Sequence, residues 1–314
     1  MKIIKPDAVL APHDILAYQF IEKVGRTAYK SEDKITEDSA VSFVKNMVKS
    51  GHWAVLEHEY LYVYCENADI FRGEHYLNCF DKYITGSFRA WYEVFDNLNH
   101  STLEEKYLND LYQIVKNKYP EVFTCERRER YIDECDEKYS ALNIYSLDRD
   151  KFIKEVKKEW GQSALTKLIP HTILFTCDRG VTHELVRHRP CAFLQESTRY
   201  VNYSKGKYGN EITVIEPCFF KKNSKEYALW REACVNAEMS YMELIEQGAT
   251  PQEARSVLPT CVKADIYVTA TEEEWQHILD LRYHGTTGKP HPQMVEVMKT
   301  AREWLLKASE GRLH

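Results

Sequence analysis

The sequence lacks the patterns that mark several common protein classes. It has no apolar run near the ~20 residues that cross a bilayer. Its first residues, MKIIKPDAVLAPHD, contain neither an apolar core nor the small-residue cleavage site of a secretory signal. It also has no GxGxxG and no GxxxxGK(S/T) pattern. We therefore expect neither a membrane or secreted protein, nor a Rossmann fingerprint, nor a P-loop.

Positive charge is also scarce. The chain has 42 lysines and arginines against 48 aspartates and glutamates, which gives a formal net charge of -6. Nucleic acids and membrane surfaces are anionic and attract basic proteins. The composition therefore argues against nucleic acid or a membrane as a partner, although a local basic pocket remains compatible with it.

Nine cysteines are present, but no two of them form a CxxC pair. An odd number of scattered thiols is typical of a reduced, cytoplasmic protein in which cysteine packs as a small apolar residue. We expect a cytoplasmic location and neither a disulfide framework nor a zinc-thiolate site.

Periodicity predicts a mixed α/β fold of the α+β type, with a largely antiparallel sheet flanked by helices. Strands and helices do not alternate in regular βαβ units, and a helical insertion is expected at about 68–170 within a single domain spanning 1–314. Thr250, Pro251 and Glu253 predict a capped helix start. The predicted helices are 14–25, 37–49, 87–97, 104–117, 148–160, one from about Val181, 225–247, 250–258, 273–283 and 291–308, and the predicted strands are 58–67, 171–177, 211–217 and 263–270.

One stretch, THELVRHRPCAFLQESTRY (182–200), concentrates chemically useful side chains. His183-Glu184 followed by His188 is one residue longer than the zinc motif HExxH. Side chains five residues apart on a helix point about 140° away from each other, so the two imidazoles would not share an ion. We expect no metal site, and a surface or packing role for His183.

The same stretch contains two candidate nucleophiles. Cys191 has arginines nearby in sequence that would stabilise a thiolate, but buried free cysteines are common and inert. Ser197 lacks the GxSxG turn that presents a nucleophilic serine. Covalent attack is therefore disfavoured for both.

The arginines of this stretch suit an anionic ligand. Arg187, Arg189 and Arg199, with Ser197 and Thr198, offer donors for phosphate or a pyrimidine carbonyl. Pro190 predicts that the helix ends directly after Arg189, because the residue before a proline is disfavoured in helical geometry. The alternative is a solvated basic turn paired with Glu184 and Glu196.

These residues resemble a known family. Arg187-His188-Arg189, seven residues, Ser197 and then Arg199-Tyr200 is similar to the RHR-x7-S signature of the flavin-dependent thymidylate synthases, the ThyX family. SGHWAVLEH (50–58), ARSVLP (254–259), LDLR (279–282) and HPQM (291–294) resemble its flanking elements in the same order. The likeness covers about 1–66 and 171–308.

The resemblance implies an enzyme that converts dUMP to dTMP. Family members take the carbon from 5,10-methylenetetrahydrofolate and the hydride from NADPH through FAD. They are homotetramers whose active sites lie at subunit interfaces. The expected partners are therefore dUMP, folate and further copies of the chain.

The resemblance also implies residue roles. Arg282 would stabilise the pyrimidine ionised at N3, and His52 would lie near the flavin ring, so these two are the expected catalytic residues. The implied dUMP-binding residues are Glu184, Arg187, Gln195, Glu196, Ser197, Thr198, Arg199, Arg255 and Arg282; the implied FAD-binding residues are Arg187, His188, Arg189, Gln195 and His277.

Physical chemistry agrees with the role of Arg282. A guanidinium about 4 Å from a negative charge is worth about 4 kcal/mol at an effective dielectric near 20. Converted at about 1.4 kcal/mol per unit, this would lower the pKa of N3 by up to about three units, less the cost of desolvation. An electron-rich ring needs no covalent attack by the protein, so Ser197 would bind and Cys191 would be a bystander.

Three positions depart from the family pattern. Ala54 stands where serine or threonine is usual, and Thr271 and Glu273 stand where asparagine and arginine are usual; all three positions serve FAD in the family. Glu273 would bring a negative side chain towards flavin phosphate. Two alternatives therefore stay open: a paralogue with other pyrimidine-nucleotide chemistry, such as hydroxymethylation, and a non-catalytic nucleotide-binding protein.

Overall fold

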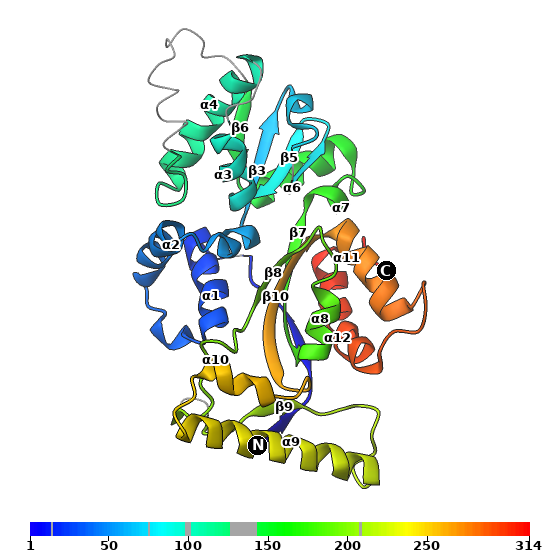
Figure 1. Cartoon of the computed structure of the whole chain (residues 1–314). Coiled ribbons are helices and arrows are strands. Elements are labelled where there is room, and N and C mark those ends of the chain that lie inside the picture. Colours follow the sequence, from blue (N-terminus) through cyan, green and yellow to red (C-terminus); the bar gives the residue numbers. More distant parts are fainter. Residues whose placement is uncertain (14, 75, 98–101, 126–142, 207–208) are drawn as a thin grey trace.

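The computed structural model describes residues 1–314 except 14, 75, 98–101, 126–142 and 207–208 (Figure 1). The predicted mixed, largely antiparallel α/β fold is confirmed. Its strands divide into two four-stranded antiparallel sheets and one two-stranded parallel ladder. No helix in the described part of the chain is both long enough and apolar enough to span a bilayer.

The central sheet has the order β2-β7-β10-β8 and is antiparallel throughout. Its strands are β2 (Asp7–Leu10), β7 (Pro170–Asp178), β10 (Lys263–Thr271) and β8 (Ala192–Gln195). β7 and β10 pair along nine residues, from Pro170 opposite Thr271 to Asp178 opposite Lys263. The sequence predicted β7 and β10 but missed β2 and β8, which are only four residues long.

Helices cover both faces of the central sheet (Figure 1). On one face lie α8 (Arg179–Leu185), α11 (Glu272–Leu279) and α12 (Pro292–Ala308), with Phe175 and Trp275 fully buried between helices and strands. On the other face, α1 (Ala17–Tyr29) packs Phe20 and Val24 against Tyr267 of β10. The neighbouring α2 (Ser39–Lys49) leads through the short turn η2 (Trp53–His58) to the second sheet.

The second sheet has the order β4-β5-β3-β6 and forms a separate lobe. Its strands are β3 (Tyr60–Cys65), β4 (Leu77–Phe80), β5 (Tyr83–Ser87) and β6 (Ile144–Leu147), and its helices are α3 (Phe88–Asp96), α4 (Thr102–Lys118), α6 (Arg149–Trp160) and α7 (Leu165–Leu168).

The lobe corrects the expectation of a helical insertion at 68–170. The three predicted helices are present as α3, α4 and α6, but the same segment also supplies β4, β5 and β6. These strands pair with one another and with β3, so the segment is α/β rather than helical. The strands escaped prediction because each has only four or five residues, too few for a clear alternation of polar and apolar side chains.

The third unit lies at the opposite end of the molecule (Figure 1). β1 (Lys2–Ile4) pairs in parallel with β9 (Thr213–Ile215), beside the long helix α9 (Lys225–Glu246). α10 (Pro251–Ala254) continues into the turn η5 (Arg255–Val257), and its predicted capping box is present: the Thr250 amide donates to Glu253 at 2.8 Å.

Three short turns complete the described elements: η1 (Glu32–Lys34), η3 (Ala68–Phe71) and η6 (Asp280–His284). η6 follows α11 directly and is a π-helical turn, where the sequence predicted a continuous helix over 273–283. Single π turns inside helices are frequent at functional sites. Arg282 lies in this turn.

Candidate functional site

The RHR segment follows α8 at the edge of the central sheet. α8 starts directly after β7, where the Asp178 carboxylate accepts a hydrogen bond from the Val181 amide at 2.9 Å. The helix ends at Leu185 rather than directly after Arg189 as Pro190 led us to expect. Arg187, His188 and Arg189 therefore lie in a loop that leads into β8, and only the histidine is buried.

Arg282 joins this loop to the far end of the chain. Its Nε donates to Nε2 of His188 at 3.2 Å, and its Nη1 contacts Oε2 of Glu184 at 2.8 Å. Its Nη2 also donates to the Glu184 carbonyl at 3.3 Å. Three residues that the resemblance assigns to the site therefore form one bonded group, in which Glu184 partly neutralises the guanidinium.

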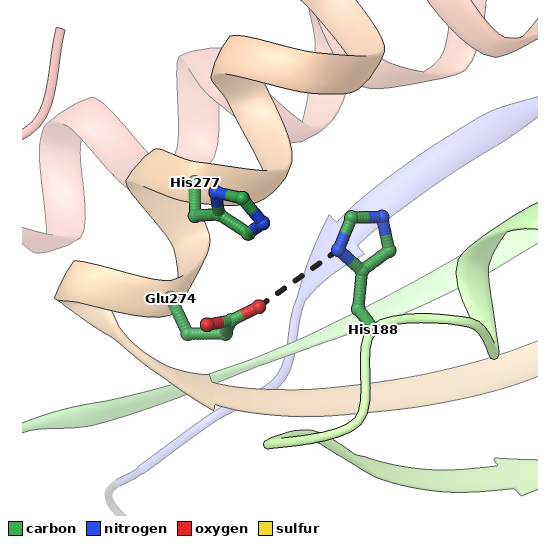
Figure 2. Close-up of side chains that lie close together, drawn as sticks. All are labelled: His188, Glu274 and His277. Carbon is green, nitrogen blue, oxygen red and sulfur yellow. Dashed lines mark ion pairs between the residues drawn. The ribbon is translucent and has the colours of Figure 1, made fainter.

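His188 also faces Glu274 and His277 of α11 (Figure 2). One ligand atom from each of these three side chains lies within 4.8 Å of the others, which is the arrangement that could hold a metal ion. His188 Nδ1 is 3.8 Å from Glu274 Oε1, and the two imidazole rings are 5.9 Å apart.

The hydrogen bond from Arg282 opposes a metal at this place. Histidines that bind metals donate the proton of their other ring nitrogen to an acceptor. Here the other nitrogen, Nε2, accepts from Arg282, which cannot give up its proton. The neutral ring then carries its proton on Nδ1, the atom that would have to bind the ion. We therefore do not assign a metal ion to this trio.

A second group of predicted residues surrounds the loop after β8. Arg255 Nη1 donates to Thr198 Oγ1 at 3.3 Å, and the Arg199 amide donates to Ser197 Oγ at 3.3 Å. The Arg199 guanidinium reaches Gln252 at 3.1 Å. The exposed Arg199 and the two hydroxyls of this loop thus lie beside the exposed Arg255 of η5, which together make a donor set suited to a phosphate.

Gln195 and Glu196 point away from that exposed surface. Gln195 Nε2 donates to Thr182 Oγ1 at 3.1 Å, which ties β8 to α8. Glu196 is 2% exposed, and its carboxylate contacts Lys263 at 2.8 Å. Among the residues predicted to bind dUMP, Glu196 is therefore placed to hold the loop rather than to touch a ligand.

A half-buried ion network that the sequence did not suggest supports the loop. Lys30 contacts both Glu196 and Asp265, and Lys263 contacts Asp265 at 2.7 Å. Burial alone would raise the pKa of Asp265, but Lys263 and Lys30 outweigh it and lower that pKa. Lysines and aspartates spread over 235 positions gave no local pattern by which to find this network.

His52 lies beside the same loop through an aromatic chain. Its Nδ1 is 3.1 Å from the Tyr29 hydroxyl, and the Tyr29 ring is 5.4 Å from that of Tyr200. Tyr200 directly follows Arg199, so this chain connects the N-terminal element with the loop after β8. The sequence missed Tyr29, which belongs to no motif, whereas Tyr200 closes the RHR-x7-S pattern.

A cavity of about 560 Å³ opens between the second lobe and the central sheet. We call it the inter-lobe cavity. Arg189 and His277, both predicted to bind FAD, line it together with Thr271 and Glu273, two of the departures from the family pattern. The other lining residues are Glu57, Tyr60, Tyr76, Asn78, Ser87, Arg89, Ala90, Glu93, Pro190, Cys191, Ala192 and Glu274.

The inter-lobe cavity suits a planar ring better than a diphosphate. Its volume lies in the range of small-ligand pockets, and Tyr60, Tyr76 and Pro190 supply apolar surface. Its ionisable groups, however, include four carboxylates and only two guanidinium groups, and carboxylates repel phosphate oxygens. The residues present therefore do not fit the diphosphate of FAD.

Cys191 borders this cavity but is half-buried in an environment that opposes a thiolate. Burial raises the pKa of its thiol, and the charge of Glu274 raises it further. Ser197 has no histidine among its described hydrogen-bond partners. Neither side chain therefore has the surroundings of an activated nucleophile.

The predicted residues thus form two groups within one chain. No described hydrogen bond or ion pair joins the Arg282 group to the loop with Arg199 and Arg255 directly. Arg187 is exposed and has no described ion-pair partner, and His183 is exposed on α8.

The chain matches a model of a known protein family. The family model described as "Thymidylate synthase complementing protein" matches residues 109–307. This match extends into the segment that we expected to lie outside the likeness, and it leaves out the N-terminal element around His52.

Individual relatives share the name flavin-dependent thymidylate synthase. A flavin-dependent thymidylate synthase of Pyrococcus abyssi is 34% identical over 106 residues, which is 34% of this chain and 43% of that protein. The enzyme of the same name from Geobacter sulfurreducens is 28% identical over 151 residues, 48% of this chain and 61% of that one. The chain thus matches about half the length of these relatives.

A solved structure offers only a distant likeness. A UMP/dUMP methylase, PolB, from Streptomyces cacaoi aligns over 99% of this chain and 96% of its own, with 13% sequence identity and a TM-score of 0.41. At this distance the likeness carries no argument about the site.

Proposed function

The chain belongs to the family of thymidylate synthase complementing proteins, and on that basis we propose that it is a flavin-dependent thymidylate synthase. In this proposal it is an enzyme that converts dUMP to dTMP in the cytoplasm. Methylenetetrahydrofolate is the carbon donor, and NADPH is the source of the hydride, which is delivered through a flavin.

One observation carries the proposal: the hydrogen bond between Arg282 and His188. The two residues are 94 positions apart, and each belongs to a different element of the family pattern. A match of two motifs by chance would not require their side chains to meet. Their contact supports the view that both motifs serve one site.

In the proposed reaction Arg282 stabilises negative charge on the pyrimidine ring. Its side chain is 22% exposed, so a ligand can approach it without large rearrangement. The full estimate of about 4 kcal/mol at 4 Å applies to an unpaired arginine. The contact with Glu184 reduces this effect, because the glutamate compensates part of the positive charge unless it turns towards the nucleotide itself.

We propose that the loop after β8 binds the phosphate of dUMP. Ser197 and Arg199 of this loop and Arg255 of η5 offer hydroxyl and guanidinium donors, and the buried Thr198 accepts a hydrogen bond from Arg255. Gln195 and Glu196 would hold this loop against α8 and the Lys30–Lys263 network. His52 would act beside it through Tyr29.

A complete site would need a second copy of the chain. Within the described residues no hydrogen bond or ion pair joins the Arg282 group to the loop after β8, whereas the proposed nucleotide needs both. Arg187 and Arg199 are exposed and so remain available to a site on another subunit. A homotetramer with sites at its interfaces, as in the family, would bring the two groups together.

For the redox cofactor we propose a flavin whose ring lies in the inter-lobe cavity beside Arg189 and His277. Arg187, His188 and Gln195, which do not line the cavity, would lie next to it. A bound flavin supplies hydride chemistry that side chains cannot. No step is assigned to FAD itself, because the carboxylates of the cavity do not suit its diphosphate.

The test is turnover by the purified protein. With dUMP, methylenetetrahydrofolate, NADPH and added flavin, we expect a product with the mass of dTMP, and oxidation of NADPH that is faster when dUMP is present. A protein that takes up no flavin and forms no product would contradict the proposal. Omission of the folate is the control, since it removes the carbon donor and leaves the protein unchanged.

A second candidate function is favoured by the acidic side chains of the cavity. Glu273 and Thr271 change the surface on which the family holds FAD, and such a change could accompany different chemistry on the nucleotide. The same product analysis decides between the two: a hydroxymethylated nucleotide would replace the methyl product. A protein without catalysis would bind dUMP alone, with the shallow salt dependence of a single phosphate.

A further inference from the structure

The inter-lobe cavity carries more negative than positive charge. Four carboxylates line it, against the guanidinium groups of Arg89 and Arg189: two come from the second lobe, Glu57 and Glu93, and two from the start of α11, Glu273 and Glu274. A ligand between the lobes therefore meets negative charge from both sides.

The positive charge of Arg89 is already compensated by two carboxylates. Its Nη1 contacts Glu57 at 2.5 Å and its Nε contacts Glu93 at 2.8 Å. An arginine held by two carboxylates has little attraction left for a third anion. Arg189, by contrast, is exposed and has no ion-pair partner within the part of the chain that the structure describes.

The start of α11 would ordinarily attract an anion. Helix N-termini present free amide groups and a partial positive charge, which favour phosphate. In α11 the first three residues are Glu272, Glu273 and Glu274, and the cap, Thr271, accepts from the Glu274 amide at 3.4 Å. The carboxylates of the first turn therefore already compensate the partial positive charge at the start of the helix, without any ligand.

Glu272 differs from its two neighbours in this turn. It is fully buried and bound by Arg312 and His171, so it serves the fold. Glu273 is exposed, has no described ion-pair partner and lines the cavity. Glu274 lies beside His188 and His277 on the same side of α11 (Figure 2).

We infer that Glu273 and Glu274 make the inter-lobe cavity select a flavin by its uncharged ring and disfavour the diphosphate tail of FAD. This inference rests on the proposed function, since it names the form of the cofactor that the same site takes. Tyr60, Tyr76 and Pro190 provide the apolar surface for the ring. The two carboxylates lie at the start of α11, where the free amide groups of the helix would otherwise stabilise the phosphates of the tail.

Binding of two flavins to the full-length protein tests the inference. Riboflavin and FAD share the ring and differ in the charged tail, so the ratio of their Kd values, measured by quenching of flavin fluorescence, reports on the tail. Removing one like charge about 4 Å away is worth about 1 kcal/mol in water, which is about fivefold in Kd. We expect Glu273→Gln to tighten FAD by about fivefold and to leave riboflavin within about twofold.

Ionic strength gives an independent readout. Salt screens repulsion as well as attraction, so added salt should tighten the binding of FAD to the wild type. In Glu273→Arg, where the repulsive group becomes attractive, salt should weaken FAD instead. Glu303→Gln, which removes an exposed carboxylate on α12 outside the cavity, is the matched control and should change neither flavin.

The outcomes separate the two proposals. An unchanged FAD-to-riboflavin ratio in Glu273→Gln, or weaker FAD binding in that variant, overturns the inference and leaves a flavin enzyme standing. Absence of binding for both flavins to the wild type, Glu273→Gln and Glu273→Arg overturns the proposed function and the inference together. A ratio that shifts towards FAD in both variants supports the inference.

Discussion

Arg282 Nε donates a hydrogen bond to His188 Nε2 at 3.2 Å. Since arginine remains protonated, this contact makes Nε2 the acceptor and leaves the proton of the neutral ring on Nδ1, which faces Glu274 at 3.8 Å. One contact thus sets the direction of the guanidinium, the tautomer of the buried histidine and the poor suitability of the trio for a metal. Of the two groups in the candidate site, the one with His188 and Glu184 is organised around Arg282.

Replacing Arg282 should remove turnover while leaving flavin in place. Arg282→Ala deletes a charge that we propose to stabilise the ionised pyrimidine, and losing one such group costs about 100-fold or more in kcat. Flavin binding should stay within about threefold, because Arg282 does not line the inter-lobe cavity. Steady-state kinetics and flavin fluorescence measure the two effects. Arg231→Ala on exposed α9 is the control, and an Arg282→Ala enzyme of normal kcat would refute the role.

Replacing Cys191 should change little. Burial, with help from Glu274, raises the pKa of this thiol, so no thiolate is present at neutral pH. We expect Cys191→Ala to retain kcat within about threefold, since the loss of one small, half-buried side chain is a packing effect. The rate of product formation is the measurement. A variant that folds, binds both ligands and forms no product would instead make Cys191 the nucleophile.

Replacing Arg199 should weaken the nucleotide rather than the chemistry. A charge-assisted hydrogen bond to phosphate is worth about 1.5–3 kcal/mol, so Arg199→Ala should raise the Kd for dUMP by about tenfold or more. Arg255→Ala should act in the same direction, since it also releases Thr198. Calorimetric titration with dUMP measures both, and deoxyuridine, which has no phosphate, is the matched ligand control. Equal losses for dUMP and deoxyuridine would contradict a phosphate site.

Stability should fall on acidification because of His58. Burial lowers the pKa of this histidine from its usual 6.5 to about 3, and its side chain is 3% exposed. Between these values the unfolded chain takes up a proton that the folded chain does not. Its contribution is therefore constant above pH 6.5 and is lost as the pH falls from 6.5 towards 3, by about 2 kcal/mol at pH 5.

Urea unfolding at pH 8 and pH 5 measures this effect. His58→Gln should reduce the difference in the free energy of unfolding between the two pH values, whatever it does to stability at pH 8. His183→Gln, at an exposed histidine on α8, should leave the difference unchanged. If the wild type and His58→Gln have the same pH dependence, burial of His58 is not its cause.

Much of the fold and part of the site followed from local sequence. The amphipathic pattern predicted α9, apolar β-favouring residues predicted β7 and β10, and the box of Thr250 and Glu253 marked the start of α10. β2, β8 and three strands of the second lobe, β4, β5 and β6, were missed because each has only four or five residues. A helix end was also placed too late, since Pro190 limits only the residue before it.

By itself, the sequence determined which side chains are candidates for the chemistry, because the RHR-x7-S pattern is a matter of residue types at fixed spacing. Tertiary structure alone decided how they are used. It placed Arg282 on His188, joined His52 to Tyr200 through Tyr29, and buried Glu196 among lysines. It also placed Glu273 in one cavity with Glu57 and Glu93 of the second lobe. Charges act through space, so their balance in a cavity depends on distances that no local pattern of residues contains.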